Sequence, residues 1–350
     1  MLSRSQGVIC WHAVITIREV AKHARVSVGT VSNVLSESDK VRPELRKRVE
    51  TAMLELDYSP NQIARSLKTR TTKTLGTIVS DITNPFFPLM IRGAEDAAME
   101  RGYLLITLNT DDHVERERRA LTVLRARKVD GVLIVMAPDD GEATHIATAL
   151  EQGTAMVCLD RMPRGIDVDA VSVNNRKGAR MCMQHLVSRG HRRIGMLTGT
   201  PSLNNAQERL EGYLEFMLEN GCLEIPSLIR NGDFRFESGY RMAKEMLLEA
   251  EPPTAIFAAN AMMGFGALKA MHELGLRCPD DVSLAVFDDT PFGDVIRPQL
   301  TVVAQPAYEL GRRGAELLID RIEGREKSAG PVRIELNPEL IVRGSTAPRR

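Results

Sequence analysis

The sequence predicts a small all-α head joined to a larger α/β body of two lobes. Three helical patterns occupy the first 60 residues. From Thr74 onward, short apolar runs alternate with helix-length amphipathic segments. Such alternation is typical of parallel sheets covered by helices on both faces. The apolar runs are too numerous for one compact sheet of this pattern, which favours two lobes.

Charge is distributed unevenly along a chain whose formal net charge is zero. The 350 residues are enough for two or three domains. Residues 1–75 hold 13 Lys and Arg but 7 Asp and Glu, whereas the remainder holds 33 and 39. A basic head on a mildly acidic body suggests an anionic partner for the head. The alternative at this point is chance clustering of charge.

The cysteines and the apolar runs indicate the compartment. Five cysteines are widely spaced, without any Cys-x-x-Cys pair: Cys10, Cys158, Cys182, Cys222 and Cys278. This pattern argues against a disulfide framework and a zinc site, and it fits a reducing cytosol. The chain lacks an apolar run of about 18 residues, so we expect no membrane-spanning helix.

Residues 1–14 are predicted to be a disordered extension. Their apolar patch is short and lacks a small-residue cleavage site, so a signal peptide is not expected. The sequence leaves open whether residues 1–13 are translated in vivo or whether translation starts near Val14.

The first two helical patterns have the geometry of a helix-turn-helix. Thr16 followed by Glu19 forms a capping box, and Ser27 is a second N-cap candidate. The small side chains of Ala21 and Ala24 permit close crossing of two short helices. The predicted apolar faces hold Ile17, Val20, Ala21 and Ala24 in the first helix, and Val28, Val31 and Leu35 in the second.

The polar face of the second helix favours DNA binding. Thr30, Ser32 and Asn33 carry short groups that can approach base edges, and Asn pairs well with adenine in the major groove. Pro43 suits the first turn of a third helix. That helix has basic residues available to phosphates: Arg42, Arg46, Lys47 and Arg48. A plain three-helix bundle with a solvated basic face is the alternative.

Residues 15–75 resemble the DNA-binding head and hinge of the LacI/GalR family of bacterial transcriptional repressors. The matching segments are TIREVAKHARVSVGTVSNVL, LELDYSPN and the hinge ARSL. The resemblance implies a helix-turn-helix domain over 15–60 and a hinge helix over 61–73. It places Val28 and Gly29 at the two base-reading positions. The predicted DNA-binding residues are Thr16, Val28, Gly29, Thr30, Ser32, Asn33, Asn61, Ala64, Leu67 and Lys68.

Two hinge residues have a specific role by this resemblance. Leu67 matches the leucine that wedges into the minor groove at the operator centre, and Ala64 matches the small residue beside it. A wedge of this kind costs a few kcal/mol of base stacking, which the contacts made to bent DNA offset. Family members are dimers, so we expect a homodimer on a near-palindromic operator.

The body shows nine strand candidates and several intervening helices. The strand candidates are 74–82, 103–110, 131–137, 156–160, 170–175, 193–199, 255–260, 282–289 and 300–305. The helix-length segments include 86–101, 113–128, 175–189, 205–220, 236–250 and 261–275.

Residues 74–346 resemble the type I periplasmic-binding-protein fold that the family uses as its effector domain. Matching segments are DITNPFF, RMPRGIDVDAVSVNN, HRRIGMLTG, ERLEGY, VSLAVFDD and LIVRGST. The resemblance implies three crossings between lobes, near residues 172, 302 and 327. Lobe 1 is then predicted over 74–171 and 303–326, and lobe 2 over 172–301 and 327–346. Ligand is expected between the lobes, at the carboxyl ends of strands.

Six residues are predicted to bind the effector where the family does so: Phe86, Asp160, Arg209, Phe234, Asn260 and Asp288. Their carboxylate, amide and guanidinium groups suit the hydroxyls of a polyol, and an aromatic ring covers an apolar face. Asp288 could instead cap a helix, and Phe86 could belong to the core. Arg161, directly after Asp160, makes an anionic ligand such as a sugar acid a hypothesis to test.

Enzymatic motifs are missing from the sequence. A dinucleotide glycine fingerprint, a Walker loop, a G-x-S-x-G elbow and a metal-spaced histidine pair are all lacking. We therefore predict neither catalytic residues nor a cofactor or metal.

The sequence predicts a cytoplasmic, nucleoid-associated regulator, most simply a repressor, whose operator affinity is switched by a small carbohydrate-like effector. The alternatives are regulation by a nucleobase-type corepressor or a protein partner. An exported solute-binding protein would share the body, but the basic head and the lack of an export signal argue against it. Effector identity, and inducer versus corepressor action, stay open.

Overall fold

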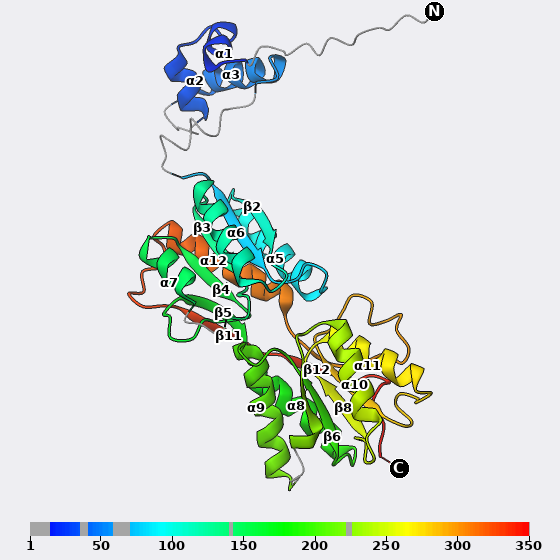
Figure 1. Ribbon diagram of the computed structural model, residues 1–350. Helices are drawn as coiled ribbons and strands as arrows, with labels where there is room; N and C mark the ends of the chain where they lie inside the picture. Colours follow the sequence, from blue (N-terminus) through cyan, green and yellow to red (C-terminus); the bar gives the residue numbers. More distant parts are fainter. Residues whose placement is uncertain (1–14, 36–40, 59–70, 140–142, 222–225, 350) are drawn as a thin grey trace, which may run out of the picture. The chain divides into compact units, whose positions relative to one another are not determined.

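The computed structural model describes residues 15–35, 41–58, 71–139, 143–221 and 226–349. The chain divides into two compact units, residues 1–72 and 73–350 (Figure 1). Each unit has its own hydrophobic core. None of the described helices is both long and apolar enough to cross a membrane.

Three short helices form the first unit. They are α1 (Ile17–His23), α2 (Val28–Leu35) and α3 (Pro43–Glu55). Each contributes a fully buried valine to one small core, namely Val20, Val31 and Val49. Helices this short are marginal alone, so the shared core supplies most of their stability.

The second unit contains two six-stranded sheets. The strands of the first sheet, in spatial order, are β11 (Arg333–Leu336), β5 (Asp169–Val173), β4 (Met156–Leu159), β3 (Gly131–Ile134), β1 (Thr74–Val79) and β2 (Leu104–Asn109). Those of the second are β12 (Glu339–Ile341), β10 (Thr301–Ala304), β9 (Ser283–Phe287), β8 (Ala255–Ala258), β6 (Ile194–Thr198) and β7 (Ile229–Asn231). All pairings are parallel except that of β12 with β10.

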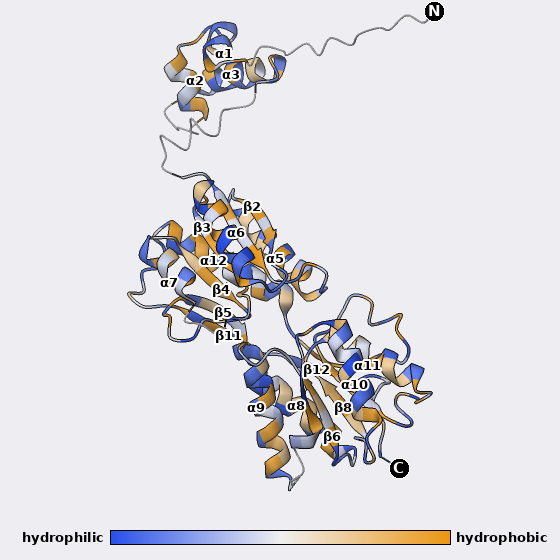
Figure 2. Ribbon diagram, in the orientation of Figure 1, coloured by the Kyte–Doolittle hydropathy of each residue, from blue (hydrophilic) through white to orange (hydrophobic). Residues whose placement is uncertain are grey.

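Helices separate the strands along the chain. They are α5 (Phe86–Glu100), α6 (Val114–Ala126), α7 (Thr144–Glu151), α8 (Asn175–Ser188), α9 (Asn204–Glu219), the 3-10 turn η1 (Pro226–Leu228), α10 (Phe236–Leu247), α11 (Ala261–Glu273) and α12 (Ala307–Ile322). Figure 2 shows mostly apolar strands and many hydrophilic residues on outer helices such as α6. All nine predicted strands and the six predicted helical segments occur in the structure.

The chain crosses between the sheets three times, and two crossings lie later than predicted. The first follows β5, close to the predicted residue 172. The second follows β10, at 305–306, because α12 packs on β3, β4 and β5 of the first sheet. The third lies at 337–338, not near 327, because β11 pairs with β5 through Arg333–Leu336. We name the parts around the two sheets lobe 1 (first sheet) and lobe 2 (second sheet).

Helices α5 and α12 approach each other through two glycines. A Cβ atom on Gly311 would lie 1.8 Å from the carbonyl oxygen of Met90, and one on Gly93 would lie 1.9 Å from that of Tyr308. Neither position has room for a side chain unless the backbones move apart. This contact joins the first helix of lobe 1 to the helix that returns after the second crossing.

We predict that Gly311→Ala destabilises lobe 1, because the added methyl group meets backbone and not a flexible side chain. Overpacking of this kind costs about 1–3 kcal/mol. Urea unfolding should report the loss. The control is Gly330→Ala, where a Cβ meets no atom within 4 Å. Equal free energies of unfolding for the two variants would show that the backbones of α5 and α12 can move apart at little cost.

Candidate functional site

The predicted reading face of α2 is accessible. Val28 is 43% exposed, Gly29 and Asn33 are exposed, and Thr30 and Ser32 are partly buried. The Ser27 hydroxyl accepts a hydrogen bond from the Thr30 amide at 3.0 Å, as expected of an N-cap.

The apolar stripe of α2 differs from the prediction. Val31 and Val34 are its buried residues, whereas Val28 faces outward and Leu35 is only partly buried. A side chain at the first helical position points away from the short core here. Val28 is therefore free for the base-reading position that the family resemblance assigned to it.

Two polar residues of the head have roles within the fold. The Glu19 carboxylate accepts hydrogen bonds from the Thr16 amide at 2.6 Å and from the Thr16 hydroxyl at 3.0 Å, which lowers the Glu19 pKa. Arg48 was predicted to be available to phosphates. It is exposed, and its Nη2 also donates to the carbonyl oxygens of Ala24 and Arg25 at 2.6 and 3.0 Å. Arg48 thus closes the C-terminal end of α1.

The hinge predictions cannot be placed in this structure. Asn61, Ala64, Leu67 and Lys68 lie outside the described residues, as does the extension over 1–14.

In the body, two buried carboxylates end strands of different lobes. Asp160 follows β4 of lobe 1 and Asp288 follows β9 of lobe 2. They are 3% and 4% exposed, and both have left-handed backbones, with φ of 61° and 75°. Burial raises the pKa of Asp160, and it raises that of Asp288 to about 6. The Asp288 carboxylate accepts a hydrogen bond from Gln305, and no helix begins directly after it, so it is not an N-cap.

Arg209, on α9, is the cation that serves both carboxylates. Its pKa is lowered by burial and raised by the charges of Asp288 and Asp160. The guanidinium lies 3.8 Å from the ring centroid of Phe287. It also donates to the Asn175 side chain at 2.8 Å and to the carbonyl oxygen of Ala259 at 2.5 Å. These contacts hold the charge in place without any ligand.

Phe234 and Asn260 form one structural unit in lobe 2. Phe234 has a left-handed backbone, with φ of 65°, and its carbonyl oxygen accepts a hydrogen bond from the Asn260 amide at 2.7 Å. The Asn260 side-chain oxygen accepts from the Met263 amide at 2.9 Å, which caps α11. Asn260 therefore positions Phe234. The Phe234 ring lies over Gly199, where a Cβ would approach it to 2.1 Å.

Phe86 lies in the core of lobe 1. It is 6% exposed, and its ring meets that of Phe87 edge to face at 5.2 Å. The structure thus supports the alternative that Phe86 contributes packing. Of the other five predicted residues, four lie just after strands and Arg209 lies within α9.

Unpaired buried atoms reveal two further residues. Gln305 donates to Asp288 and Asn205 donates to Asp160, so each amide nitrogen faces a carboxylate. The amide oxygens of both side chains, and Oδ1 of Asp160, are buried and have no hydrogen-bond partner in the part of the chain that the structure describes. Gln305 ends a predicted strand, as Asp160 does, so its position at the end of an apolar run could have identified it from the sequence. Asn205 lies in the first turn of α9, where sequence alone offers no such signal.

Direct contacts join the two lobes near these residues. The Met162 amide donates to the Asn204 side chain at 2.9 Å, beside the bond between Asn205 and Asp160. Arg235 of lobe 2 lies 3.5 Å from Asp81 and 3.6 Å from Asp112 of lobe 1. These contacts connect the two lobes close to the charged cluster.

The charge of Arg161 is already matched within the protein. Its Nη1 donates to Asp112 at 2.6 Å and to the carbonyl oxygen of Met136 at 2.9 Å. Asp160 lies 3.9 Å from its Nε. This pairing weakens the argument for an anionic effector that adjacency in the sequence suggested.

Comparison with known proteins agrees with both units. Residues 16–61 match the model of bacterial regulatory proteins of the lacI family, and residues 183–346 match a periplasmic binding protein-like domain. The ribose operon repressor of Halalkalibacterium halodurans is 37% identical, over 95% of this chain and 97% of that protein. The repressor PurR of Escherichia coli O1:K1 is also 37% identical, over 95% and 97%.

Solved structures give the same result. The lac repressor dimer bound to operator and the anti-inducer ONPF is 29% identical, with a TM-score of 0.84 over 96% of this chain and 100% of that one. A LacI family regulator from Enterococcus faecium with bound ribose is 31% identical, with a TM-score of 0.70 over 79% and 100%. The chain belongs to the lacI family of bacterial transcriptional repressors.

Proposed function

We propose that the chain represses transcription from a near-palindromic operator, and that a sugar or sugar derivative bound between the lobes switches its affinity for DNA. One observation carries the effector part of this proposal. Buried polar atoms on Asp160, Asn205 and Gln305, which lack a hydrogen-bond partner among the described residues, come from both lobes and lie at one charged cluster. An unpaired buried polar atom costs about 1–3 kcal/mol, so a ligand that pairs with several gains affinity.

The chemistry of these atoms specifies hydroxyl donors. All three unpaired atoms are hydrogen-bond acceptors, and ionised carboxylates are acceptor-only. A polyol supplies several O–H donors at the spacing of its carbons, and the face of Phe234 offers an apolar surface to its C–H groups. Ribose is the ligand of the related Enterococcus faecium structure, which supports the same class of effector.

The head supports the DNA part of the proposal. An exposed polar face on an eight-residue helix contacts few base pairs, so useful specificity requires two heads on one operator. We therefore propose a homodimer, like the lac repressor dimer.

The body offers a surface that suits contact between two copies. The edge strand β2 exposes Leu104 and Ile106, and α5 exposes Leu89 and Met99. We propose that the protein acts at the nucleoid.

The switch requires that the effector prefers one arrangement of the lobes. A ligand shifts such an equilibrium only by its differential affinity for the two states. Because Asp160 and Asp288 belong to different lobes, a ligand that contacts both gains affinity only when the lobes are close. By the family resemblance, lobe movement alters the spacing of the two hinges over 61–73. Whether DNA is released or bound then depends on which arrangement fits the operator.

A nucleobase-type corepressor is the second candidate, favoured by the 37% identity to PurR. Isothermal titration calorimetry with pentoses, hexoses and purine bases separates the two classes. We expect heat from a sugar and none from the bases. Binding of bases alone would reject the sugar proposal and retain the repressor. A lack of response to both panels would point to a protein partner.

We predict that Asn33→Ala weakens binding to an operator selected from a random duplex library by about 10- to 100-fold, as loss of one bidentate base contact does. Affinity for a scrambled duplex should fall far less, because phosphate contacts dominate there. Fluorescence anisotropy at one salt concentration measures both. Thr51→Ala, exposed on α3, is the control and should leave both unchanged. Equal losses on the two duplexes would exclude base reading by Asn33.

We predict that effector affinity falls as the pH is lowered through about 6, because the pKa of Asp288 is raised to about 6 and its protonated form accepts fewer hydroxyl bonds. The effect of pH on folding stability has the opposite sign to its effect on effector binding. The native state binds more protons between pH 3.8 and 6, so this group's contribution to stability decreases as the pH rises through that window. Asp288→Asn should reduce the pH dependence of binding near pH 6 and reduce effector affinity while leaving operator affinity near wild type. Normal induction by this variant would remove Asp288 from the site.

We predict that Arg235→Gln weakens binding of any effector that contacts both lobes by about two- to fivefold, since exposed ion pairs contribute up to about 1 kcal/mol. Loss of its pairs with Asp81 and Asp112 lowers the population of this lobe arrangement. Calorimetry gives the affinity, and small-angle scattering should show a larger radius of gyration. Arg241→Gln, which removes a pair within α10, is the matched control. Identical behaviour of the two variants would contradict a lobe-coupling role for Arg235.

A further inference from the structure

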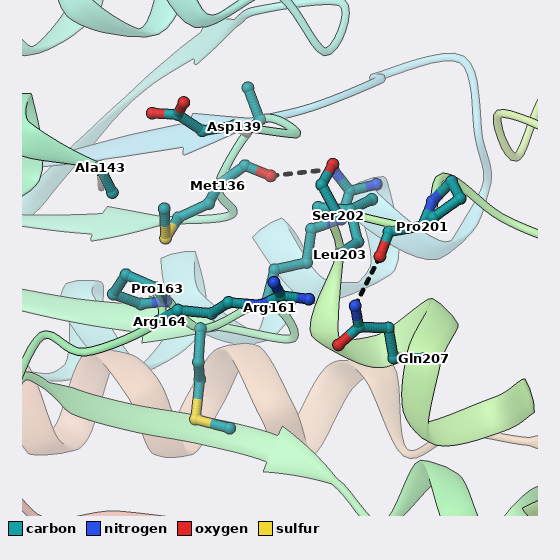
Figure 3. A pocket seen from close by; sticks show the side chains of 12 residues that line it. Met136, Asp139, Ala143, Arg161, Pro163, Arg164, Pro201, Ser202, Leu203 and Gln207 are labelled. Carbon is teal, nitrogen blue, oxygen red and sulfur yellow. Dashed lines mark hydrogen bonds between the residues drawn. The ribbon is translucent and has the colours of Figure 1, made fainter. Parts of the chain in front are cut away.

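A cavity of about 280 Å³ lies beside the charged cluster, between loops of the two lobes (Figure 3). Lobe 1 lines it with Met136, Asp139 and Arg161, and lobe 2 lines it with Ser202, Leu203 and Gln207. Asp160, Arg209 and Asp288 are not among its walls. Its volume is close to the lower end of known ligand pockets, about 300 Å³, so it has room for one ring-sized group.

The cavity and the effector cluster meet at Arg161. This residue is 3% exposed, and its Nε is buried without a hydrogen-bond acceptor among the described residues. The same Nε lies 3.9 Å from Asp160, which carries one of the unpaired acceptors of the cluster. On the opposite wall, Leu203 precedes the turn in which Asn205 donates to Asp160. Arg161 is therefore the residue that lies between the cavity and Asp160.

The unpaired atoms on the two sides have opposite requirements. The cluster offers acceptors and needs donors, whereas Arg161 Nε is a donor and needs an oxygen. Sugar oxygens satisfy both, because a hydroxyl donates and accepts and a glycosidic oxygen accepts. The cavity wall itself combines apolar Met136 and Leu203 with Asp139, Ser202 and Gln207. Mixed walls of this kind match a sugar ring, which has C–H faces and a hydroxylated edge.

The charges on the cavity wall do not select an acidic substituent. Nη1 of Arg161 is paired with Asp112 at 2.6 Å. Of the other charged residues of the wall, Asp139 is a carboxylate and the exposed Arg164 a guanidinium. An anion would meet both, whereas a neutral group gains the Nε hydrogen bond without depending on either charge.

We propose that this cavity is a second subsite, which takes a neutral second sugar ring, so that the effector is a disaccharide or glycoside and not a single ring. The inference rests on the proposed sugar-binding function of the cleft. It identifies Arg161 as the residue at the junction, where its Nε donates to an oxygen at or near the link between the rings.

The test compares single- and two-ring sugars by isothermal titration calorimetry on the full-length protein. The probes are glucose, galactose and ribose against cellobiose, maltose, lactose and melibiose. We expect at least one two-ring sugar to bind ten-fold or more tightly than either of its constituent rings. If every single-ring sugar binds as tightly as the two-ring sugars, the subsite is refuted and the proposed function survives. If none of the sugars binds, the proposed sugar-binding function itself fails, and the repressor assignment stands.

Two substitutions at Ser202 test whether the second sugar ring occupies the cavity. Ser202 is partly buried in a loop, so a larger side chain there can fill the cavity without entering either sheet core. Ser202→Trp should weaken binding of the two-ring sugar at least ten-fold and leave binding of its single ring within twofold. Ser202→Ala, which removes the hydroxyl without filling the space, should keep at least a third of the affinity. Unchanged two-ring binding by Ser202→Trp would overturn the proposal.

Gluconate and glucose 6-phosphate test whether the cavity instead binds an acidic group. We expect neither to bind more tightly than glucose. Tighter binding of either anion, reduced by Gln207→Glu but not by the neutral Gln207→Met, would assign the cavity to an acidic group and overturn the inference. Thermal unfolding and operator binding of each variant confirm that the fold is retained.

Discussion

The buried charge of Arg209 is the interaction on which the proposed effector site depends. Two carboxylates, Asp160 and Asp288, are buried at the ends of strands from different lobes, and both have raised pKa values. Without a cation they would repel each other and lose their hydration at once. Arg209 compensates both charges while stacking on Phe287 and donating to Asn175 and Ala259. The cluster is therefore formed before any ligand arrives, which reduces the cost of ordering the site on binding.

The same cluster links the lobes. Asn205 of lobe 2 donates to Asp160 of lobe 1, and Asn204 beside it accepts from the Met162 amide. Arg235 adds exposed pairs with Asp81 and Asp112. The bond between Asn205 and Asp160 is buried, whereas the Arg235 pairs are partly exposed and contribute at most about 1 kcal/mol each. Under the proposed function, a ligand that contacts groups of both lobes would favour one arrangement of the lobes.

Much of the site could be predicted from the sequence because the carboxyl ends of parallel strands form a common edge. Polar residues directly after apolar runs, such as Asp160 and Asp288, carry that signal. Asn205 does not, since its role arises from a turn of α9 that meets β4 of the other lobe. Arg48 has a second role for a related reason: it is exposed, but whether its Nη2 also reaches the end of α1 depends on how α1 and α3 pack. The strands β11 and β12 are short and partly exposed, so they lack the continuous apolar pattern of buried strands.

The sequence by itself determined the local elements, the basic helical head, the alternating body and the family to which the chain belongs. These follow from periodicity, capping residues and contiguous motifs, all of which are local. Only the tertiary structure decided that Asn260 positions Phe234, that Phe86 belongs to the core, and that the charge of Arg161 is already paired. It alone places a cavity beside the effector cluster. Hydrogen-bond satisfaction and burial depend on neighbours distant in the chain, and composition or spacing does not encode which of those neighbours meet.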